Sequence, residues 1–372
     1  MIRLSKSIIG EKEANEVKRI LLDDGYLGMG AEVGKFESDI ADYLGVSFDN
    51  VVCVNTGTSA LHLAVEAVVE KDFEVLVPSF TFLSSYQAIS AAGAIPVSCD
   101  VHEDTLSIDL EDAEKRITHK SKAIMVVHYA SNVANIDKVY EFAKKHNLRV
   151  IEDAAHAFGC THKNKKIGSF GDIVCFSFDG IKNITSGEGG AIVTNDAHVL
   201  SIVKDARLLA IEKDSDKRYN GQRSWDFDVK RQGYRYHMSN IFAAIGRVQL
   251  SRLDSEFGPK RIELLKLYQV LLGSNQNVVF QKHEQDAYII PHIVSVRILN
   301  NQRDGLKDEL EKEKIPTGIH YKPNHLLTYY KTDYNLPVTE KVYKEIITLP
   351  LHPEISTSDV ENICKIINNY LN

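Results

Sequence analysis

Short apolar runs rich in β-branched residues recur through the first 200 residues of the chain. They alternate with longer segments in which apolar residues return at helical spacing. This alternation is typical of βαβ units, whose parallel strands form a sheet that helices cover on both faces. The runs lie at residues 51–54, 75–78, 95–98, 123–127, 149–153, 172–178 and 191–194. We therefore expect an α/β fold with a large three-layer domain around a mostly parallel central sheet.

The pattern changes near residue 238. Apolar positions keep helical spacing from there to about residue 272, with an interruption at Gly258-Pro259 that predicts a helix end or kink. Beyond it, the pattern predicts an apolar strand at 288–298, an exposed helix at 300–314 and an amphipathic closing helix at 361–371. We predict that residues 1–245 form the large domain and that residues 246–372 form a smaller α+β domain, entered through a long bridging helix.

The composition is that of an ordinary globular protein. The chain has 372 residues, of which 44% are hydrophobic and 26% charged, so it can bury a large core. Its net charge is −7, and its basic residues are dispersed and offer no stripe for nucleic acid. No stretch approaches the roughly 18 uncharged apolar residues of a membrane span, and residues 1–18 hold no apolar signal segment. We expect a cytoplasmic protein that binds neither nucleic acid nor membrane.

The cysteines predict neither a disulfide framework nor a metal site. Their number is odd, they show no CxxC spacing, and most lie inside apolar runs. Buried free thiols in a reducing compartment are the expectation. The five are Cys53, Cys99, Cys160, Cys175 and Cys364.

Small and polar residues follow several predicted strands, where open α/β sheets bind their ligands. Residues 55–59 read Asn-Thr-Gly-Thr-Ser before a helical segment, so their N–H groups could bind a phosphate at a helix N-terminus. An ordinary helix cap is the alternative. Asp153 ends the run at 149–153, where a buried carboxylate needs a cation such as a protonated pyridine nitrogen. A capping Asp followed by a buried His156 is again the alternative.

Lys182 follows the run at 172–178 and precedes the glycine-rich residues 185–190. Apolar flanks can desolvate its amine and lower its pKa, which gives the neutral form that attacks an aldehyde. A solvated surface lysine is the alternative for any single Lys. Ser177 offers a hydroxyl to a phosphate, and Phe82 offers a ring to cover a flat heterocycle. A phosphate cradle, a ring cover, a carboxylate for a ring nitrogen and a lysine together describe pyridoxal phosphate.

Three motifs then indicate a family. The chain reads IEDAAHAFG from residue 151, GSFGDIVCFSF from residue 168 and KNITSGEGGAIVTND from residue 182. This arrangement resembles the DegT/DnrJ/EryC1/StrS family of sugar aminotransferases, which are pyridoxal-phosphate enzymes of fold-type I. The resemblance extends over nearly the whole chain, from residues 25–37 to residues 349–356. It implies pyridoxal phosphate as the cofactor and a fold like that of aspartate aminotransferase.

The resemblance implies a role for each motif residue. Lys182 would join the cofactor aldehyde covalently and later carry the proton between the two carbon centres. Asp153 would keep the pyridine nitrogen protonated, His156 would lie near the ring, and Phe82 would cover it. The contacts to the cofactor phosphate would come from Gly57, Thr58 and Ser177. No metal ion is expected.

The resemblance also implies an obligate homodimer. Residues 233–250 match the region by which one family subunit completes its neighbour's site. His237 falls where relatives place a residue that reaches the neighbour's phosphate, and simple packing at the bridging helix is the alternative. Residues 317–323 resemble the lining of the sugar-nucleotide pocket. The predicted substrate contacts are Tyr26, His320, Tyr321 and His325.

These implications define the expected reaction. The amino group would move from L-glutamate to a nucleotide-linked keto-sugar in two half-reactions. The loop KNITSGEGG favours amination at C4 of a 4-keto-6-deoxy hexose, and residues 125–137 favour a dTDP-sugar. A C3 enzyme on a UDP-, GDP- or dTDP-sugar and a non-catalytic regulator that binds the cofactor are the alternatives. The product would enter a surface polysaccharide, such as lipopolysaccharide O-antigen, or a decorated metabolite.

Overall fold

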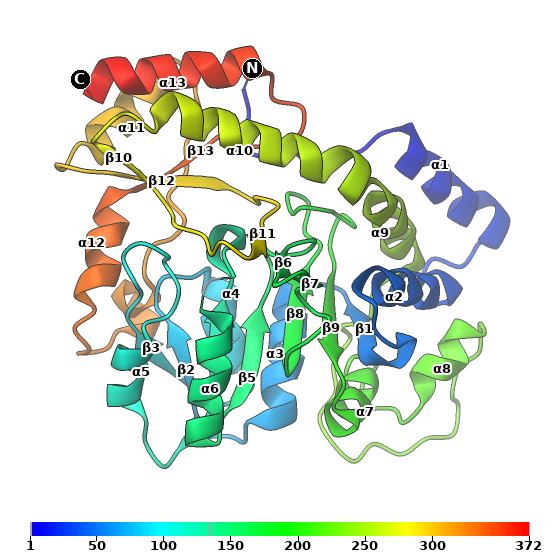
Figure 1. Ribbon diagram of the computed structural model, residues 1–372. Helices are drawn as coiled ribbons and strands as arrows, with labels where there is room; N and C mark the ends of the chain where they lie inside the picture. The colour runs from blue at the N-terminus through cyan, green and yellow to red at the C-terminus, as the bar shows by residue number, and fades with distance from the viewer. Residues whose placement is uncertain (1, 134, 372) are drawn as a thin grey trace.

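A seven-stranded sheet forms the centre of this computed structural model, which describes residues 2–133 and 135–371 (Figure 1). Its strands are β1 (Val51–Val54), β2 (Glu74–Pro78), β3 (Ile95–Cys99), β4 (Ser121–Val127), β5 (Arg149–Asp153), β8 (Ile173–Ser177) and β9 (Gly190–Thr194). The order across the sheet is β1-β9-β8-β5-β4-β2-β3. Neighbouring strands are parallel except at β9, which is antiparallel to both β1 and β8. The structure confirms the α/β fold with a mostly parallel central sheet.

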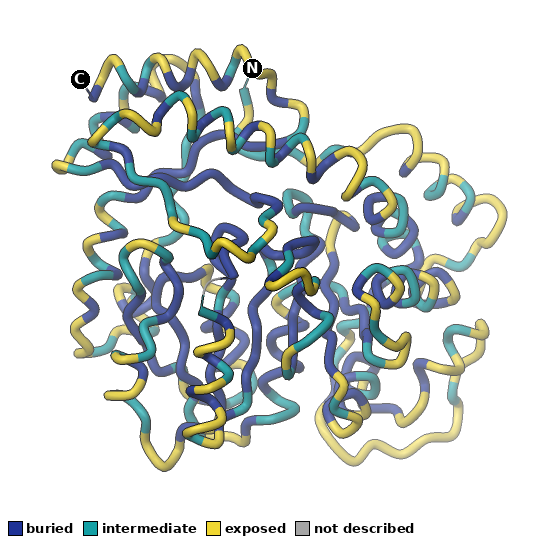
Figure 2. The backbone as a smooth tube through the Cα atoms, in the orientation of Figure 1, coloured by how far each residue is buried: buried dark blue, intermediate teal, exposed yellow. Residues whose placement is uncertain are grey.

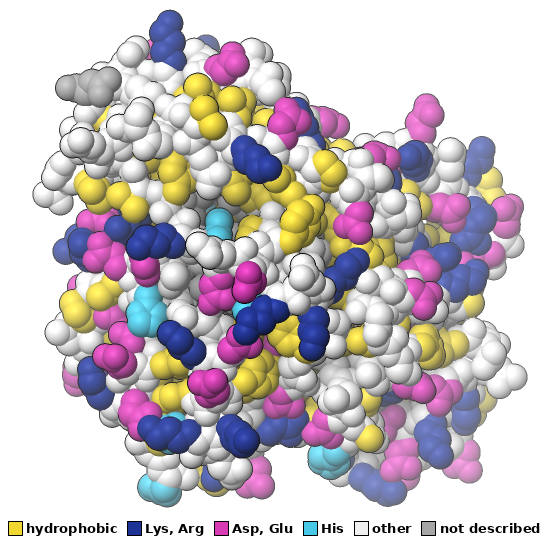
Figure 3. Space-filling view, viewed as in Figure 1, with side chains coloured by type: hydrophobic (Ala, Val, Ile, Leu, Met, Phe, Trp, Pro, Cys, Tyr) yellow, Lys and Arg dark blue, Asp and Glu magenta, His cyan; other side chains and the backbone are white. Residues whose placement is uncertain are grey.

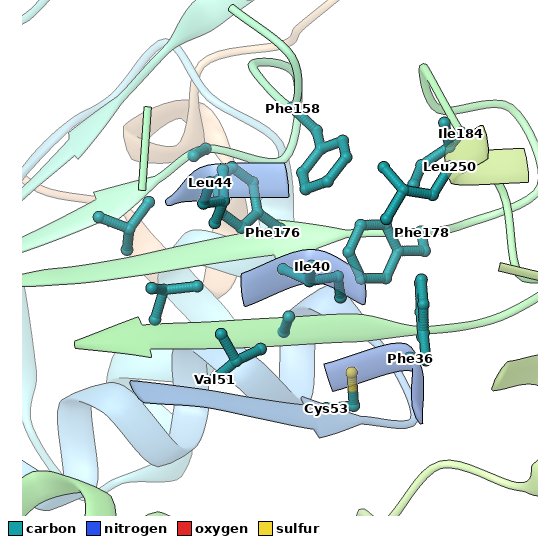
Figure 4. Close-up of a cluster of buried hydrophobic side chains, with 14 of the residues drawn as sticks. Phe36, Ile40, Leu44, Val51, Cys53, Phe158, Phe176, Phe178, Ile184 and Leu250 are labelled. Carbon is teal, nitrogen blue, oxygen red and sulfur yellow. The ribbon is translucent and has the colours of Figure 1, made fainter. Parts of the chain in front are cut away.

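The alternation of side chains along each strand explains why both faces of the sheet are covered. In β1, Val51 and Cys53 pack in one cluster with Phe36 and Phe176, as Figure 4 shows. The intervening residues, Val52 among them, pack in a second cluster on the other face. Successive residues of a strand point to opposite faces, and both faces are buried here, so the strand reads as one apolar run.

Helices on both faces of this sheet begin and end at local sequence signals. Asp109 and Asp196 cap two of them through their carboxylates, and Gly45 ends another with φ of 73°. The α-helices that precede residue 220 in the described part of the chain are α1 (Glu11–Arg19), α2 (Ala31–Leu44), α3 (Gly57–Val68), α4 (Leu83–Ala91), α5 (Leu110–Arg116), α6 (Ile136–His146), α7 (Ala197–Ala206) and α8 (Asp214–Tyr219). Figure 2 shows the strands buried between these helices, whose outer faces are exposed.

The loop between β8 and β9 determines where Lys182 lies. It contains residues 178–189 and no helix, whereas a connection that crosses the sheet to a parallel strand is usually made by a helix. Strand β9 instead returns antiparallel beside β8, pairing Ser177 with Gly190. The loop therefore stays at the carboxyl end of β8, together with Lys182.

A second, three-stranded antiparallel sheet lies in the C-terminal part, in the order β10 (Val278–Phe280), β12 (Val294–Ile298), β13 (Ile346–Leu349). The helices around it are α10 (Gly258–Leu272), α11 (Arg303–Lys312), α12 (Pro337–Glu345) and α13 (Thr357–Leu371), whereas α9 (Asn240–Arg252) packs against α1 and α2. A π-helical turn, Leu253–Phe257, separates α9 from α10, and Pro259 lies in the first turn of α10, where its missing N–H costs nothing. The predicted boundary at residue 245 falls inside α9, and the division into two domains stays a prediction.

The single strand predicted at residues 288–298 is wrong. Strand β11 (Ala287–Tyr288) pairs with β6 (Thr161–His162), which also pairs with β7 (Lys165–Lys166), whereas β12 begins only at Val294. Pro291 lies between the two strands and has no N–H for a ladder. The helix expected at 300–314 forms as α11, with Leu306 and Leu310 buried, so it is exposed on one face only.

The surface and the cysteines agree with the composition. Acidic and basic side chains are mixed over the face shown in Figure 3. All five cysteines are buried and free. Within residues 2–133 and 135–371, none of the helices combines the length and the apolar character of a membrane span.

Candidate active site

A cavity of about 280 Å³ lies at the edge of the large sheet where the parallel strands end. Residues that follow β1, β5 and β8 line it, together with the segment at 320–321 from the C-terminal part. Open α/β sheets bind their ligands at this edge. The predicted site residues that line it are Gly57, Thr58, Phe82, Asp153, His156, Ser177, Lys182, His320 and Tyr321.

The N-terminus of α3 forms one wall of the cavity. Thr56 caps the helix, because its Oγ1 accepts a hydrogen bond of 3.0 Å from the Ser59 N–H. Gly57 and Thr58 carry the other first-turn N–H donors, at the positive end of the helix dipole. Ser177, the last residue of β8, lines the cavity together with this turn. The cap therefore does not use the N–H groups of Gly57 and Thr58, which could bind an anion.

Asp153 lies at the carboxyl end of β5 and is 5% exposed. Ser85 Oγ donates a hydrogen bond of 2.7 Å to Asp153 Oδ2, and the Ala155 N–H donates to Oδ1 at 3.2 Å. Burial raises the pKa of Asp153 above its ordinary value, and the hydrogen bond from Ser85 opposes this rise. No helix begins among the described residues that directly follow Asp153, so it is not a helix cap. Its carboxylate would be stabilised by a cation in the cavity.

The Lys182 side chain lines the cavity beside Asp153. Its backbone N–H donates to the Asp179 carbonyl at 3.1 Å, and its own carbonyl accepts from Arg261 Nη2 at 3.4 Å. Burial lowers the pKa of Lys182 to about 8, although attraction to Asp153 and Asp179 opposes the change. Near that pH about half of the amine is neutral, and this is the form that attacks an aldehyde.

Rings form the remaining walls of the cavity. Phe82 is 55% exposed, and its ring centre lies 5.4 Å from that of Tyr321. His156 lies deeper, with its ring centre 4.3 Å from that of His292. Burial lowers the pKa values of His156, His292 and His320 below the ordinary value of histidine. These three imidazoles are therefore neutral at neutral pH.

Three of the predicted residues lie outside this cavity. His325 is buried, with its Nδ1 atom 2.7 Å from Ser79 Oγ. His237 forms an isolated antiparallel bridge with Val54, and burial lowers the pKa of His237 to about 4. The Tyr26 hydroxyl is buried without a hydrogen-bond partner among the described residues. A ligand bound in the cavity of the same chain would therefore not contact these three side chains.

Sequence reasoning missed several side chains at the site, Ser85 and His292 among them. Ser85 lies inside α4, and the Ser-Ser pair that follows the Phe82 region was its sole signal. His292 belongs to the apolar run at 288–298 and has no local signal. Its place beside His156 depends on how the segment between β11 and β12 passes the cavity.

The chemistry of this residue set fits pyridoxal phosphate. The open N-terminus of α3 accepts an anion, and the exposed Phe82 ring can cover a flat heterocycle. Asp153 is a buried carboxylate that can pair with a protonated ring nitrogen. Lys182 provides an amine of lowered pKa for the aldehyde. The phosphate, the ring, the ring nitrogen and the aldehyde of the cofactor thus each have a suitable group in the same cavity.

Gly57 leaves no room for a side chain at the phosphate wall. A Cβ on Gly57 would lie 2.7 Å from Ser177 Cβ and 3.2 Å from Ser177 Cα. We expect Gly57→Ala to push α3 away from Ser177 and to weaken pyridoxal phosphate binding at least about tenfold, or about 1.4 kcal/mol. Fluorescence titration with the cofactor measures this affinity. Gly28→Ala is the matched control, because a Cβ there meets nothing within 4 Å; equal affinity in Gly57→Ala and the wild type would contradict the prediction.

Comparisons with known proteins agree with this geometry. A sequence model of the DegT/DnrJ/EryC1/StrS aminotransferase family matches residues 7–368. GDP-perosamine synthase of Escherichia coli O157:H7 is 35% identical to this chain, covering 96% of this chain and 95% of that protein. The dTDP-4-dehydro-2,3,6-trideoxy-D-glucose 4-aminotransferase of Saccharopolyspora spinosa is 30% identical, with 98% and 95% covered. Spr1654 of Streptococcus pneumoniae, solved in its PLP form, is 28% identical with a TM-score of 0.89, and each chain is covered completely.

The expected family is thus confirmed by a match over nearly the whole chain and by two relatives of at least 30% identity. The fold of a cofactor-bound relative agrees over the full length. The chain belongs to the DegT/DnrJ/EryC1/StrS aminotransferase family, whose members are pyridoxal-phosphate-dependent sugar aminotransferases.

Proposed function

We propose that this protein binds pyridoxal phosphate and moves the amino group of L-glutamate to C4 of a dTDP-linked 4-keto-6-deoxy hexose. The observation that carries the proposal is the meeting of Lys182, Asp153 and Phe82 around one cavity. Two relatives support a nucleotide-sugar acceptor, since one is named as a 4-aminotransferase of a dTDP-sugar and the other as a GDP-perosamine synthase. The first name also supports position C4.

Three residues of the cavity have parts in this reaction. Bound pyridoxal phosphate supplies a ring that accepts electrons while an amino group is exchanged with a ketone. The neutral amine of Lys182 binds the cofactor, and it can take a proton from one carbon and return it to another. Asp153 holds a proton on the ring nitrogen, because a buried carboxylate is stabilised beside a cation. Phe82 covers the ring and keeps water from one of its faces.

The proposal includes a homodimer. Trp225 and Phe227 are exposed on the segment that leads to His237, and they offer apolar surface that a second subunit could cover. His237 lies outside the cavity of its own chain, so in our proposal it serves the cavity of the neighbouring subunit. Sedimentation of the purified protein reports the oligomeric state.

An absorption experiment tests the proposed reaction. The purified protein should develop a visible band with pyridoxal phosphate, and L-glutamate should bleach it. A dTDP-linked 4-keto-6-deoxy hexose should then restore the band and yield the amino sugar, which mass spectrometry detects. GDP- and UDP-linked 4-keto sugars and a 3-keto sugar are the comparison substrates. Restoration by the 3-keto sugar alone would move the amination to C3, and a band that responds to no amino donor would favour the regulator alternative.

A further inference from the structure

The turn after β4 holds the His156 side chain from two directions. Ala130 and Ser131 have φ values of 50° and 70°, a conformation that residues other than glycine rarely adopt. This backbone directs the Ala130 N–H to His156 Nδ1 at 3.2 Å. Ser131 Oγ donates to the His156 carbonyl. Two residues in an unfavourable backbone conformation therefore hold His156 in place, and such conformations cluster at functional sites.

The contact with Ala130 determines where the imidazole proton lies. A backbone N–H can only donate, so His156 Nδ1 must accept the hydrogen bond and carry no proton. The proton of the neutral ring is then on Nε2. Adding a proton to Nδ1 would bring two donors together, and the burial that lowers the pKa of His156 acts in the same direction. His156 is thus a neutral imidazole of one tautomer.

This tautomer orients the hydroxyl of Tyr321. His156 Nε2 lies 3.2 Å from Tyr321 Oη. Because Nε2 carries the proton, Tyr321 Oη accepts from it, and the phenolic proton of Tyr321 points away from the imidazole. Burial raises the pKa of Tyr321, so the phenol keeps its proton at neutral pH. Tyr321 lines the same cavity as Lys182.

We infer that Tyr321 is a catalytic hydrogen-bond donor to the carbonyl oxygen of the sugar acceptor, and that Ala130 and His156 position it. This inference rests on the proposed function. When nitrogen adds to the carbonyl carbon, negative charge develops on the oxygen, and a fixed donor in a buried site stabilises that charge more than water does. The phenol keeps its own proton throughout. The carbonyl oxygen leaves as water with the two protons that the nitrogen loses, and the Lys182 amine, which lines the same cavity, can carry them from one atom to the other.

The first test concerns His156 alone and needs no cofactor. The titratable groups that face this ring are Tyr129, Lys182, His292, His320 and Tyr321. Lys182 and His320 oppose a positive charge on it by repulsion. Nitrogen-15 NMR of histidine-labelled protein, assigned through His156→Gln, should show an unprotonated Nδ1 and a protonated Nε2 from about pH 6 to 8. A protonated Nδ1 or a titration within that range would overturn the positioning role.

The second test concerns Tyr321. Tyr321→Phe keeps the ring beside Phe82 and removes only the hydroxyl. Cofactor affinity and the visible band should stay unchanged, while kcat/KM for the keto-sugar falls by about 10² to 10³. His156→Gln, which keeps a donor near the Nε2 position, should lose less activity than His156→Leu. Wild-type turnover in Tyr321→Phe would overturn the inference. If the wild type aminates no keto-sugar, the proposed function fails, and the tautomer of His156 still decides whether His156 positions Tyr321.

Discussion

Replacement of Lys182 by alanine is expected to lower kcat for amino transfer by at least about 10⁴-fold, which corresponds to about 5.4 kcal/mol. The variant loses the amine that binds the cofactor and the group that moves the proton, and no other lysine lines the described cavity to replace it. Steady-state assays with L-glutamate and the keto-sugar measure the loss. Borohydride reduction of the wild type followed by peptide mass spectrometry should find the cofactor on the peptide that contains Lys182.

Lys166→Ala is the matched control for this variant. Burial also lowers the pKa of Lys166, but its Nζ lies over the Tyr43 ring at 3.0 Å and outside the cavity. We expect this control to retain wild-type turnover and cofactor binding. Turnover of Lys182→Ala within tenfold of the wild type, or a reduced cofactor on another lysine, would show that the reaction does not depend on Lys182.

Replacement of Asp153 by asparagine is expected to reduce kcat by at least about 10³-fold. The amide has nearly the same shape but no charge, so it cannot hold a proton on the ring nitrogen. The stability of the native state should not fall in this variant. Burial raises the pKa of Asp153, which means that its charged form destabilises the native state at neutral pH, and asparagine removes that charge. Calorimetry of the cofactor-free protein should therefore show an unchanged or higher Tm beside the loss of activity.

A cofactor analogue makes the test of Asp153 sharper. Asp153→Ala leaves room near the ring nitrogen, and N-methylated pyridoxal phosphate carries a permanent positive charge there. The analogue should restore part of the activity of Asp153→Ala, because the ring no longer depends on a carboxylate for its charge. The same analogue should not help Lys182→Ala. If Asp153→Asn works as well as the wild type, Asp153 has no electrostatic role in the reaction.

Some of the site could be predicted because each signal lies within a few residues of a strand end. Asp153 and Ser177 are the last residues of β5 and β8, Lys182 lies in the loop after β8, and parallel strands bring their carboxyl ends to one edge of a sheet. Ser85 and His292 carry no such signal. Ser85 lies on α4 and donates a hydrogen bond to Asp153, which is 68 residues away in the sequence. The His292 ring packs against that of His156, although the two residues are also far apart in the sequence. Tertiary packing alone creates these contacts.

The sequence by itself determined the α/β class, the seven central strands, the family and the residues at the strand ends, because apolar periodicity and short motifs are local properties of the chain. Only the tertiary structure decided which residues share the cavity. It brought Tyr321 to His156 and kept His325 out, beside Ser79. It also divided the run at 288–298 between two sheets. These outcomes depend on how distant segments pack against one another, and contacts between distant segments leave no local pattern in the chain.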